Sequence, residues 1–333
     1  MSIKIIKQGI ADTIQDGGRF GHQHLGINPT GAMDIIAAQT ANMLVGNNLN
    51  DAVIELHFPA AAFLFEQQTM IALSGADFSA VINDITVPVN TPVIVQKNCV
   101  LQFKKIKEGA RCYFSVKGGF NMPQWLNSYS TNLKANAGGY FGMYLHKNNV
   151  LNLNEILNYS SLLKNNDCIV LNWKADIKIL YKQHHIINII KGNEYEWLNE
   201  SSKKIFTSSS FIITSKSDRM GYRMINEKLI PNHDRQLLST GVTKGTIQLL
   251  PDGQLIILMA DHQTTGGYPR IAHVISADIS SLAQYSFNSS VQFKLINQQE
   301  AEGIFYKQYQ YLQQLQNACT FRLQEYLSKH GID

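Results

Sequence analysis

The chain has 333 residues, of which 44% are hydrophobic and 16% charged, and its formal net charge is +4. Its basic residues are scattered, and pairs such as Lys104-Lys105 fall short of the run of about five to eight that is typical of nucleic-acid binding. No apolar stretch approaches the roughly 20 residues of a membrane helix, and the start lacks a signal-peptide pattern. We therefore expect a soluble protein with no nucleic-acid or membrane partner.

In chain order, short apolar or alternating stretches separated by turn residues predict a mainly β protein built from barrels or sandwiches. The expected strands are Lys4–Gln8, Thr69–Ser74, Pro92–Val95, Val100–Lys104, Ala110–Val116, Ile186–Ile190, Ser210–Thr214, Thr246–Leu249 and Val291–Leu295. Helical spacing of apolar residues predicts few helices, at Ala32–Leu44, at Ile279–Gln284 and, most clearly, from about Gln298 to Lys329.

A stretch rich in asparagine, serine and lysine, Asn148–Asn172, carries no motif and marks the expected domain boundary. We therefore expect an N-terminal domain over residues 1–170, a second domain over 171–297 and a C-terminal helix over 298–333. A weak internal similarity, which agrees with two related units, links Arg19-Phe20-Gly21-His22 to Arg219-Met220-Gly221-Tyr222.

The most informative segment follows the apolar run Leu255–Met259. Five polar residues, Asp261-His262-Gln263-Thr264-Thr265, precede the pair Gly266-Gly267, and Tyr268 comes next. Glycines permit positive φ and let a ligand approach bare backbone amides, so one interpretation is a concave recognition surface. The alternative is a hairpin in which the polar side chains only satisfy the turn.

Other polar groups beside glycines allow the same two interpretations. Arg19 follows Gly17-Gly18 and either binds an anion or pairs with Asp16 across a turn. Arg219 and Arg223 either converge on a carboxylate or are solvated loop residues.

Two further candidates are Asp77, which ends an apolar strand, and His262, the most attractive titratable group. Adjacent strand residues face opposite sides, so Asp261 and His262 need not meet. GxxxxGK[ST], GxSxG and HExxH are absent, and no metal site is expected. The four cysteines show no CxxC pairing, which is typical of a reduced, cytoplasmic protein.

The segment DHQTTGGYP and the upstream block Ser217-Asp218-Arg219-Met220-Gly221-Tyr222-Arg223 resemble the family of allophanate hydrolase subunit 2 and the C/D-type carboxyltransferase proteins. Matching N-terminal blocks follow in family order, among them QDGGRFG, TGAMD, ANMLVGN and SGAD. The resemblance implies two cyclophilin-like β-barrel domains. This chain departs from the family pattern at Met143, where an arginine is usual.

The resemblance implies one component of a bacterial ATP-dependent 5-oxoprolinase, which converts pyroglutamate to glutamate. The expected partners are an allophanate hydrolase subunit 1-like protein (the B component of 5-oxoprolinase) and a lactam-utilisation protein (its A component), with ATP bound at the level of the complex. No biotin is expected on this chain. The alternatives are a KipA-like regulator that antagonises a histidine-kinase inhibitor, and a biotin-dependent carboxyltransferase that acts on a urea-like acceptor.

In the enzyme interpretation the substrate is a small carboxylate or amide, and a lactam would be polarised by donors of the 264–267 turn. The candidate catalytic residues are Asp261, His262 and Thr265. The candidate substrate-binding residues are Arg19, Asp77, Arg219, Arg223, Gln263, Thr264, Gly266, Gly267 and Tyr268.

Overall fold

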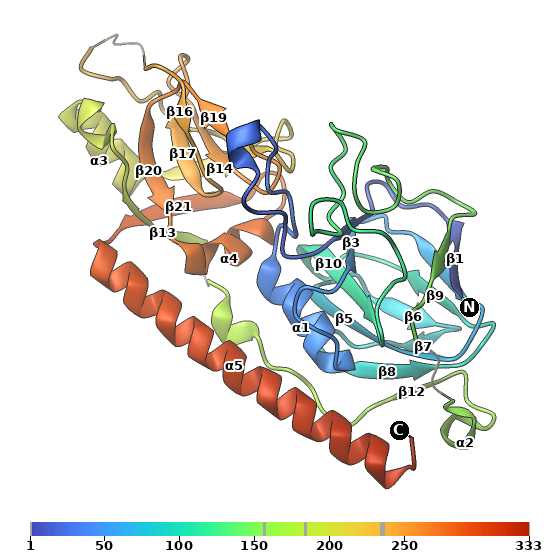
Figure 1. The fold of residues 1–333 in the computed structure, drawn as a ribbon. Coiled ribbons are helices and arrows are strands. Elements are labelled where there is room, and N and C mark those ends of the chain that lie inside the picture. The colour runs from blue at the N-terminus through green and yellow to red at the C-terminus, as the bar shows by residue number, and fades with distance from the viewer. Residues whose placement is uncertain (1, 156–157, 183–184, 234–236, 333) are drawn as a thin grey trace. The chain divides into compact units, whose positions relative to one another are not determined.

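The computed structural model describes residues 2–155, 158–182, 185–233 and 237–332. The prediction of a mainly β protein with a few short helices and a C-terminal helix is confirmed, and of the two expected β-barrels one is closed in the described residues. Two compact units are present (Figure 1). Unit 1 comprises Met1–Gly18, Asp34–Asp176 and Leu312–Asp333, and unit 2 comprises Arg19–Met33 and Ile177–Tyr311.

Unit 1 is built from two six-stranded antiparallel sheets, with no backbone ladder between their edges among the described residues. The first sheet has the order β11 (Val150–Asn152), β1 (Ser2–Lys7), β4 (Ala62–Phe65), β9 (Val100–Phe103), β6 (Ala80–Ile82) and β7 (Ile85–Thr86). The second has the order β12 (Cys168–Val170), β8 (Pro92–Val95), β5 (Thr69–Asp77), β10 (Glu108–Val116), β3 (Val53–Leu56) and β2 (Thr13–Gln15).

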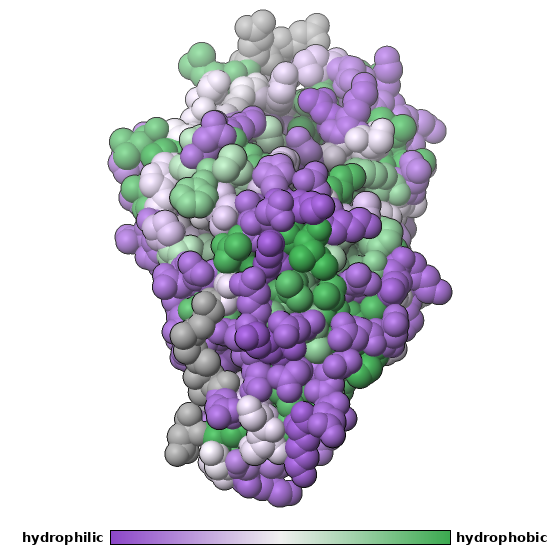
Figure 2. Space-filling model, turned by 90° about the vertical axis from the view of Figure 1, so that its right-hand side faces the viewer, coloured by the Kyte–Doolittle hydropathy of each residue, from purple (hydrophilic) through white to green (hydrophobic). Residues whose placement is uncertain are grey.

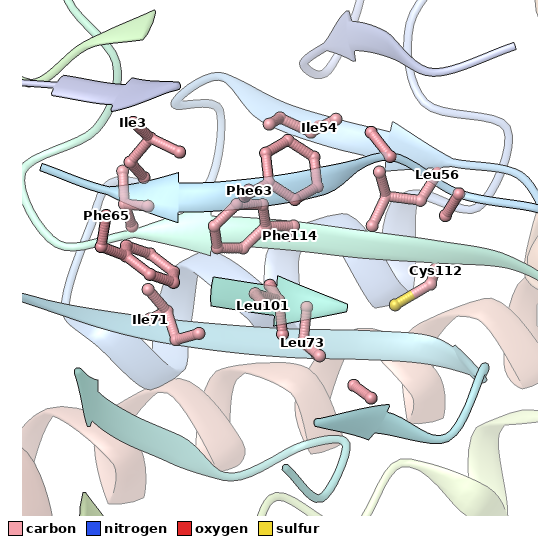
Figure 3. Packing of buried hydrophobic residues seen from close by; sticks show 14 of the residues in the cluster. Ile3, Ile54, Leu56, Phe63, Phe65, Ile71, Leu73, Leu101, Cys112 and Phe114 are labelled. Carbon is pink, nitrogen blue, oxygen red and sulfur yellow. The ribbon is translucent and has the colours of Figure 1, made fainter. Parts of the chain in front are cut away.

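The hydrophobic core of unit 1 lies between these sheets. Figure 3 shows Ile3, Phe63 and Leu101 of the first sheet packed with residues of the second, such as Ile54 and Phe114. The rings of Phe63 and Phe114 lie 5.1 Å apart between centroids. Because strand side chains alternate between faces, one apolar set from each sheet is enough to fill this layer.

Two helices contribute to a second apolar cluster on the other face of the second sheet. This cluster contains Met70 and Ile94 from the sheet, Leu44 from α1 (Ile35–Val45) and Leu323 from α5 (Gln298–Lys329). A shorter helix, α2, spans Ser160–Leu163. Helix α1 begins later than the sequence suggested because the Asp34 side chain caps it, accepting from the Ala37 amide at 3.0 Å.

Unit 2 contains a closed barrel in the order β13 (Ile186–Lys191), β20 (Arg270–Val274), β17 (Thr246–Leu249), β18 (Leu255–Leu258), β15 (Gly221–Ile225), β14 (Ser210–Ile213) and β21 (Ser290–Leu295). Strands β16 (Thr240–Gly241) and β19 (Thr265–Gly266) form a separate small ladder. The helical segments are α3 (Glu200–Ser208), α4 (Ile279–Ala283) and the 3₁₀ turns η1 (Gln23–Leu25), η2 (Lys178–Leu180), η3 (Tyr195–Trp197) and η4 (Ser276–Asp278). Alternate strand residues, such as Tyr222, Ile247 and Ile257, fill the barrel.

The units do not follow the chain linearly, as the predicted ranges 1–170, 171–297 and 298–333 do. Residues 19–33 precede α1 yet belong to unit 2. Lys244 donates to the carbonyl oxygens of Ala32 and Met33, both at 3.0 Å, and Met33 is part of the barrel-side core. Helix α5 contributes its first part to unit 2 and the rest, from Leu312, to unit 1.

The surface is mixed in character. On the face shown in Figure 2, hydrophilic residues predominate and hydrophobic ones gather in a smaller patch near its middle. Scattered apolar residues at the surface are ordinary in soluble and partner-bound proteins alike. Within the described ranges, no helix has both the length and the apolar character needed to cross a membrane.

Candidate functional site

The two-stranded ladder of β16 and β19 lies outside the barrel, and the segment 261–268, which carries β19, is here called the hairpin arm. Strand β19 pairs with β16, with Thr240 opposite Gly266 and Gly241 opposite Thr265. The amide of Val242 also donates to the carbonyl of Thr264 at 3.1 Å. The pairing engages the backbone of this turn, so its amides are not all free to polarise a ligand.

The two glycines allow close packing against neighbouring atoms and do not adopt a left-handed backbone conformation. Neither Gly266 nor Gly267 has a positive φ, in contrast to the expectation from sequence. A Cβ at Gly266 would lie 2.7 Å from Nε2 of Gln248, and one at Gly267 would lie 3.3 Å from the carbonyl oxygen of Leu237. Glycine at 266 therefore lets the arm lie directly over the Gln248 side chain.

Asp261 forms a two-point ion pair with Arg219. Its carboxylate oxygens accept from Nε and Nη2 of Arg219 at 2.9 and 3.0 Å, and only 15% and 12% of the two side chains are exposed. Nη2 also donates to the carbonyl of Gly31 at 2.7 Å, and the Asp261 carbonyl accepts from Asn28 at 3.0 Å. The pair thus fastens residues 28–31 to the end of β18.

His262 is buried, and its imidazole is directed to backbone. Nδ1 lies 2.6 Å from the carbonyl oxygen of Gln263, and because a carbonyl only accepts, Nδ1 carries the proton. Burial lowers the pKa of His262 below 6.5, and the nearby charge of Lys244 lowers it further. The imidazole is therefore neutral at neutral pH.

A cleft of about 440 Å³, here called the barrel cleft, lies on the outer face of unit 2. It includes three of the predicted residues, Arg223, Gln263 and Tyr268. The remaining lining residues are Lys216, Asp218, Met220, Gly221, Gln248, Leu250, Pro251, Asp252 and Ile256. Its volume lies in the range of about 300–1,000 Å³ that is typical of small-molecule sites.

Strand register explains how the barrel cleft is assembled. Ile256 on β18 is paired with Arg223 on β15 and with Gln248 on β17. Directly paired residues point to the same face, and the intervening residues fill the barrel interior, so this row points outward. At Gly221 a Cβ would meet Ile256 side-chain atoms at 2.8 Å, which explains the glycine in the Met220-Gly221-Tyr222 block.

The charged side chains at the barrel cleft differ in whether they have hydrogen-bond or ion-pair partners. The Asp218 carboxylate accepts from the amides of Met220 and Gly221, at 2.8 and 3.2 Å, and the Asp252 carboxylate accepts from the Gln254 amide at 3.0 Å. Within the described ranges, the side chains of Lys216 and Arg223 form neither an ion pair nor a hydrogen bond. The acidic groups thus stabilise turns, while the two cations are available to an anionic ligand.

The other candidates lie outside the barrel cleft. Arg19 is only 1% exposed, and Nη1 donates to Oγ1 of Thr30 at 2.7 Å. Asp77 belongs to unit 1, where it accepts from the Ser79 amide at 2.8 Å and pairs with Lys107 at 3.2 Å. The remaining candidates form or support the hairpin arm and do not line the cleft; they are Asp261, His262, Thr264, Thr265, Gly266, Gly267 and Arg219.

Gln248 and Lys216 are the main lining residues that sequence reasoning missed. The alternation in Thr246–Leu249 places Gln248 on the outer face, but nothing local indicates that the hairpin arm buries it. Lys216 directly precedes the block that carries the family resemblance. In the described part of the chain, no group of three or more His, Cys, Asp or Glu side chains could hold a metal ion.

A second cleft of about 580 Å³ lies in unit 1, along the irregular segment between β10 and β11. Half of its lining residues carry aromatic or amide side chains, among them Trp125, Asn136, Tyr140 and Phe141. Met143, where the family resemblance led us to expect an arginine, does not line it and is 45% exposed.

Together these features define a two-unit β protein with a cleft of small-molecule size beside its barrel. Residues 25–295 match the family model described as "Carboxyltransferase domain, subdomain A and B", so the chain belongs to this family. It is 35% identical to the C component of 5-oxoprolinase from Escherichia coli over 313 residues, which cover 94% of this chain and 97% of that protein. The same component from Haemophilus influenzae is 35% identical over 304 residues, or 91% and 94% of the two chains.

Among solved structures, the urea amidolyase of K. lactis superposes with a TM-score of 0.85 at 25% identity. The match covers 94% of this chain but only 20% of that protein, so the chain spans about a fifth of its length.

Proposed function

We propose that this chain is the C-type component of an ATP-dependent 5-oxoprolinase. The observation that carries the proposal is the end-to-end similarity to the C component of the E. coli enzyme, which covers 97% of that protein. The reaction hydrolyses the lactam C–N bond of pyroglutamate, so that the carbonyl carbon gains the oxygen of water and the nitrogen becomes the amine of glutamate.

The barrel cleft suits such a substrate in both size and charge. Pyroglutamate carries one carboxylate, and the side chains of Lys216 and Arg223 can bind it, Arg223 through two parallel hydrogen bonds. Gln263 and Tyr268 extend over the same cleft from the hairpin arm. In the proposal Asp261 and Arg219 hold this arm in place, and His262 supports it as a neutral side chain.

The proposal requires partner proteins. The sequence lacks the GxxxxGK[ST] loop, and in the proposal ATP acts at the level of the complex, with the allophanate hydrolase subunit 1-like protein and the lactam-utilisation protein. No biotin is attached in this scheme. We place the complex in the cytoplasm, where the four unpaired cysteines would stay reduced.

Reconstitution tests the proposal. The chain is combined with both partner proteins from the same genome, and pyroglutamate-dependent ATP hydrolysis and glutamate release are measured. We expect turnover only from the complete set, and loss of at least about tenfold in kcat/KM for Arg223→Gln, because a charge-assisted contact to the carboxylate is removed.

Arg322→Gln is a matched control, because Arg322 lies on α5 with 60% of its side chain exposed and, among the described residues, has its ion pair with nearby Glu325. Robust turnover by the isolated chain, or an inactive complete set, would refute the proposal.

Carboxyl transfer is a second candidate, favoured by the structural match to K. lactis urea amidolyase. It would require carboxybiotin on a separate carrier protein. Transfer of labelled carboxylate from such a carrier to urea in the presence of this chain would support it, and failure of transfer with an active carrier would exclude it.

A further inference from the structure

We propose that Gln248 is a specificity-determining residue of the barrel cleft, where its side-chain oxygen accepts a hydrogen bond from an N–H of the ligand. The ligand class is then a small carboxylate with an amide or lactam N–H close to the carboxylate. Pyroglutamate is one member of this class, and to that extent the inference rests on the proposed function.

The first observation is an unpartnered acceptor on a residue that lines the cleft. Gln248 lines the barrel cleft although its side chain is 0% exposed. Its Oε1 atom is buried and has no hydrogen-bond partner in the part of the chain that the structure describes. More than about 90% of buried polar groups in proteins are hydrogen-bonded, so a buried amide oxygen at a cleft calls for a donor.

The second observation fixes which amide atom faces the ligand. Nε2 of Gln248 lies 3.4 Å from the carbonyl oxygen of Tyr268, which can only accept. Rotating the amide by half a turn would place two oxygens against each other, so Nε2 points to Tyr268 and Oε1 is the atom left for a ligand. The close approach of Gly266, described above, holds the amide from the same side.

The third observation sets the spacing between the acceptor and the cations. Gln248 and Arg223 are each paired with Ile256, so they lie on the two strands that flank β18. Neighbouring strands are about 4.8 Å apart, which places their backbones roughly 10 Å from each other. Both side chains point outward from the barrel, and a ligand a few ångströms wide fills the remaining distance.

The charge balance then selects the ligand. Lys216 and Arg223 have no ionic partner in the described ranges, whereas Asp218 and Asp252 cap turns. A carboxylate therefore fits beside the cations and an N–H beside Gln248. A neutral urea would leave the cations unused, and a lactone acid would leave Gln248 unsatisfied. Sites built to bind a ligand N–H discriminate strongly against analogues that lack it.

Ligand analogues test the inference on the unmodified protein. Binding of pyroglutamate is compared with that of N-methylpyroglutamate and of 5-oxotetrahydrofuran-2-carboxylate, the lactone, which both lack the N–H, and with that of 2-pyrrolidone, which lacks the carboxylate. Calorimetry is performed on the full chain and on the reconstituted complex. We expect the lactone to bind about 10–100-fold more weakly than pyroglutamate.

Two variants should give opposite patterns. Gln248→Met keeps the volume of the side chain but removes the acceptor, so the preference for lactam over lactone should disappear. Arg223→Gln should weaken pyroglutamate and the lactone by the same factor, about tenfold or more, and leave the affinity for 2-pyrrolidone unchanged. Arg322→Gln is again the control and should change nothing.

Equal affinities of the wild-type chain for lactam and lactone would overturn the inference, and so would a preference that persists in Gln248→Met. Should that variant not fold, the wild-type analogue series decides alone. Failure of the proposed function is separate, because it means no turnover of pyroglutamate by the complete set. In that case N-acetylglycine and N-acetyl-N-methylglycine provide an acyclic pair, and a preference for the first would still support Gln248 as an N–H acceptor.

Discussion

Replacing Asp261 by asparagine should lower stability much more than ligand affinity. Asparagine would turn an NH₂ group toward one of the two Arg219 donors, which lie 2.9 and 3.0 Å from the carboxylate oxygens. The guanidinium would then keep, among the bonds described above, one hydrogen bond to the amide oxygen and its contact to Gly31, and it would lose its ionic partner.

The magnitude follows from the burial of the pair. Breaking a fully buried ion pair costs about 3–5 kcal/mol, and exposed pairs are worth about 0–1 kcal/mol. With 12% and 15% of the side chains exposed, we expect Asp261→Asn to lower the free energy of unfolding by about 2–3 kcal/mol. For a unit of roughly 150–250 residues, this shifts the melting temperature by about 4–12 °C.

A double-mutant cycle with Arg219→Met isolates the interaction. Chemical denaturation of the four proteins should give a coupling energy of roughly 2 kcal/mol, since the second substitution removes a charge already left unpaired. Glu325→Gln, which breaks the exposed pair with Arg322, should cost less than about 1 kcal/mol. A coupling energy near zero would refute the structural role of Asp261. So would an Asp261→Asn protein with wild-type stability and no ligand binding, which would indicate that Asp261 acts directly on the ligand.

Three further predictions concern other parts of the molecule. Burial raises the pKa of Asp12 from 3.8 to about 7, so the folded state holds this proton more tightly than the unfolded state. The stabilisation that the bound proton gives is complete below pH 4 and is lost as the pH rises to 7, at 1.36 kcal/mol per pKa unit. Urea titrations should therefore show the stability of Asp12→Asn relative to wild type rising by up to about 4 kcal/mol over that range. A stability difference that does not change with pH would contradict this prediction. Gly221→Val should distort the barrel cleft through Ile256 and weaken pyroglutamate binding in calorimetry, and unchanged affinity would show that the row is not part of the site. NMR titration should give His262 a pKa below 6.5 with the proton on Nδ1, and a value above 7 would disprove the neutral assignment.

Local pattern was enough to predict many elements. Strand β17 and helix α5 have the predicted bounds, because alternation over Thr246–Leu249 and helical spacing over Gln298–Lys329 are properties of neighbouring residues. The expected apolar stripe of α5 is only partly packed. Leu323 is buried, whereas Phe305 and Tyr309 are about half exposed.

The site depended on contacts that no local pattern contains. Asp261 and Arg219 are 42 residues apart, and their pairing follows from the closure of β15 against β18. Gln248 occupies an outward position of its strand, like any alternate strand residue, and Gly266 and Tyr268 of the hairpin arm lie against its side chain. The two arginines of the Arg219-Met220-Gly221-Tyr222-Arg223 block do not converge, because Arg219 precedes the strand and Arg223 lies on it.

The assignment of residues 19–33 to unit 2 and of Leu312–Asp333 to unit 1 has a consequence for biosynthesis. Unit 1 needs residues from both ends of the chain, and unit 2 needs a segment synthesised more than 140 residues before its main part begins at Ile177. On the ribosome, neither unit can be completed in the simple order in which its residues emerge, because each unit combines segments that are distant in the chain. Cutting the gene near residue 170 would therefore leave two incomplete fragments, which should regain native structure only when they are produced together.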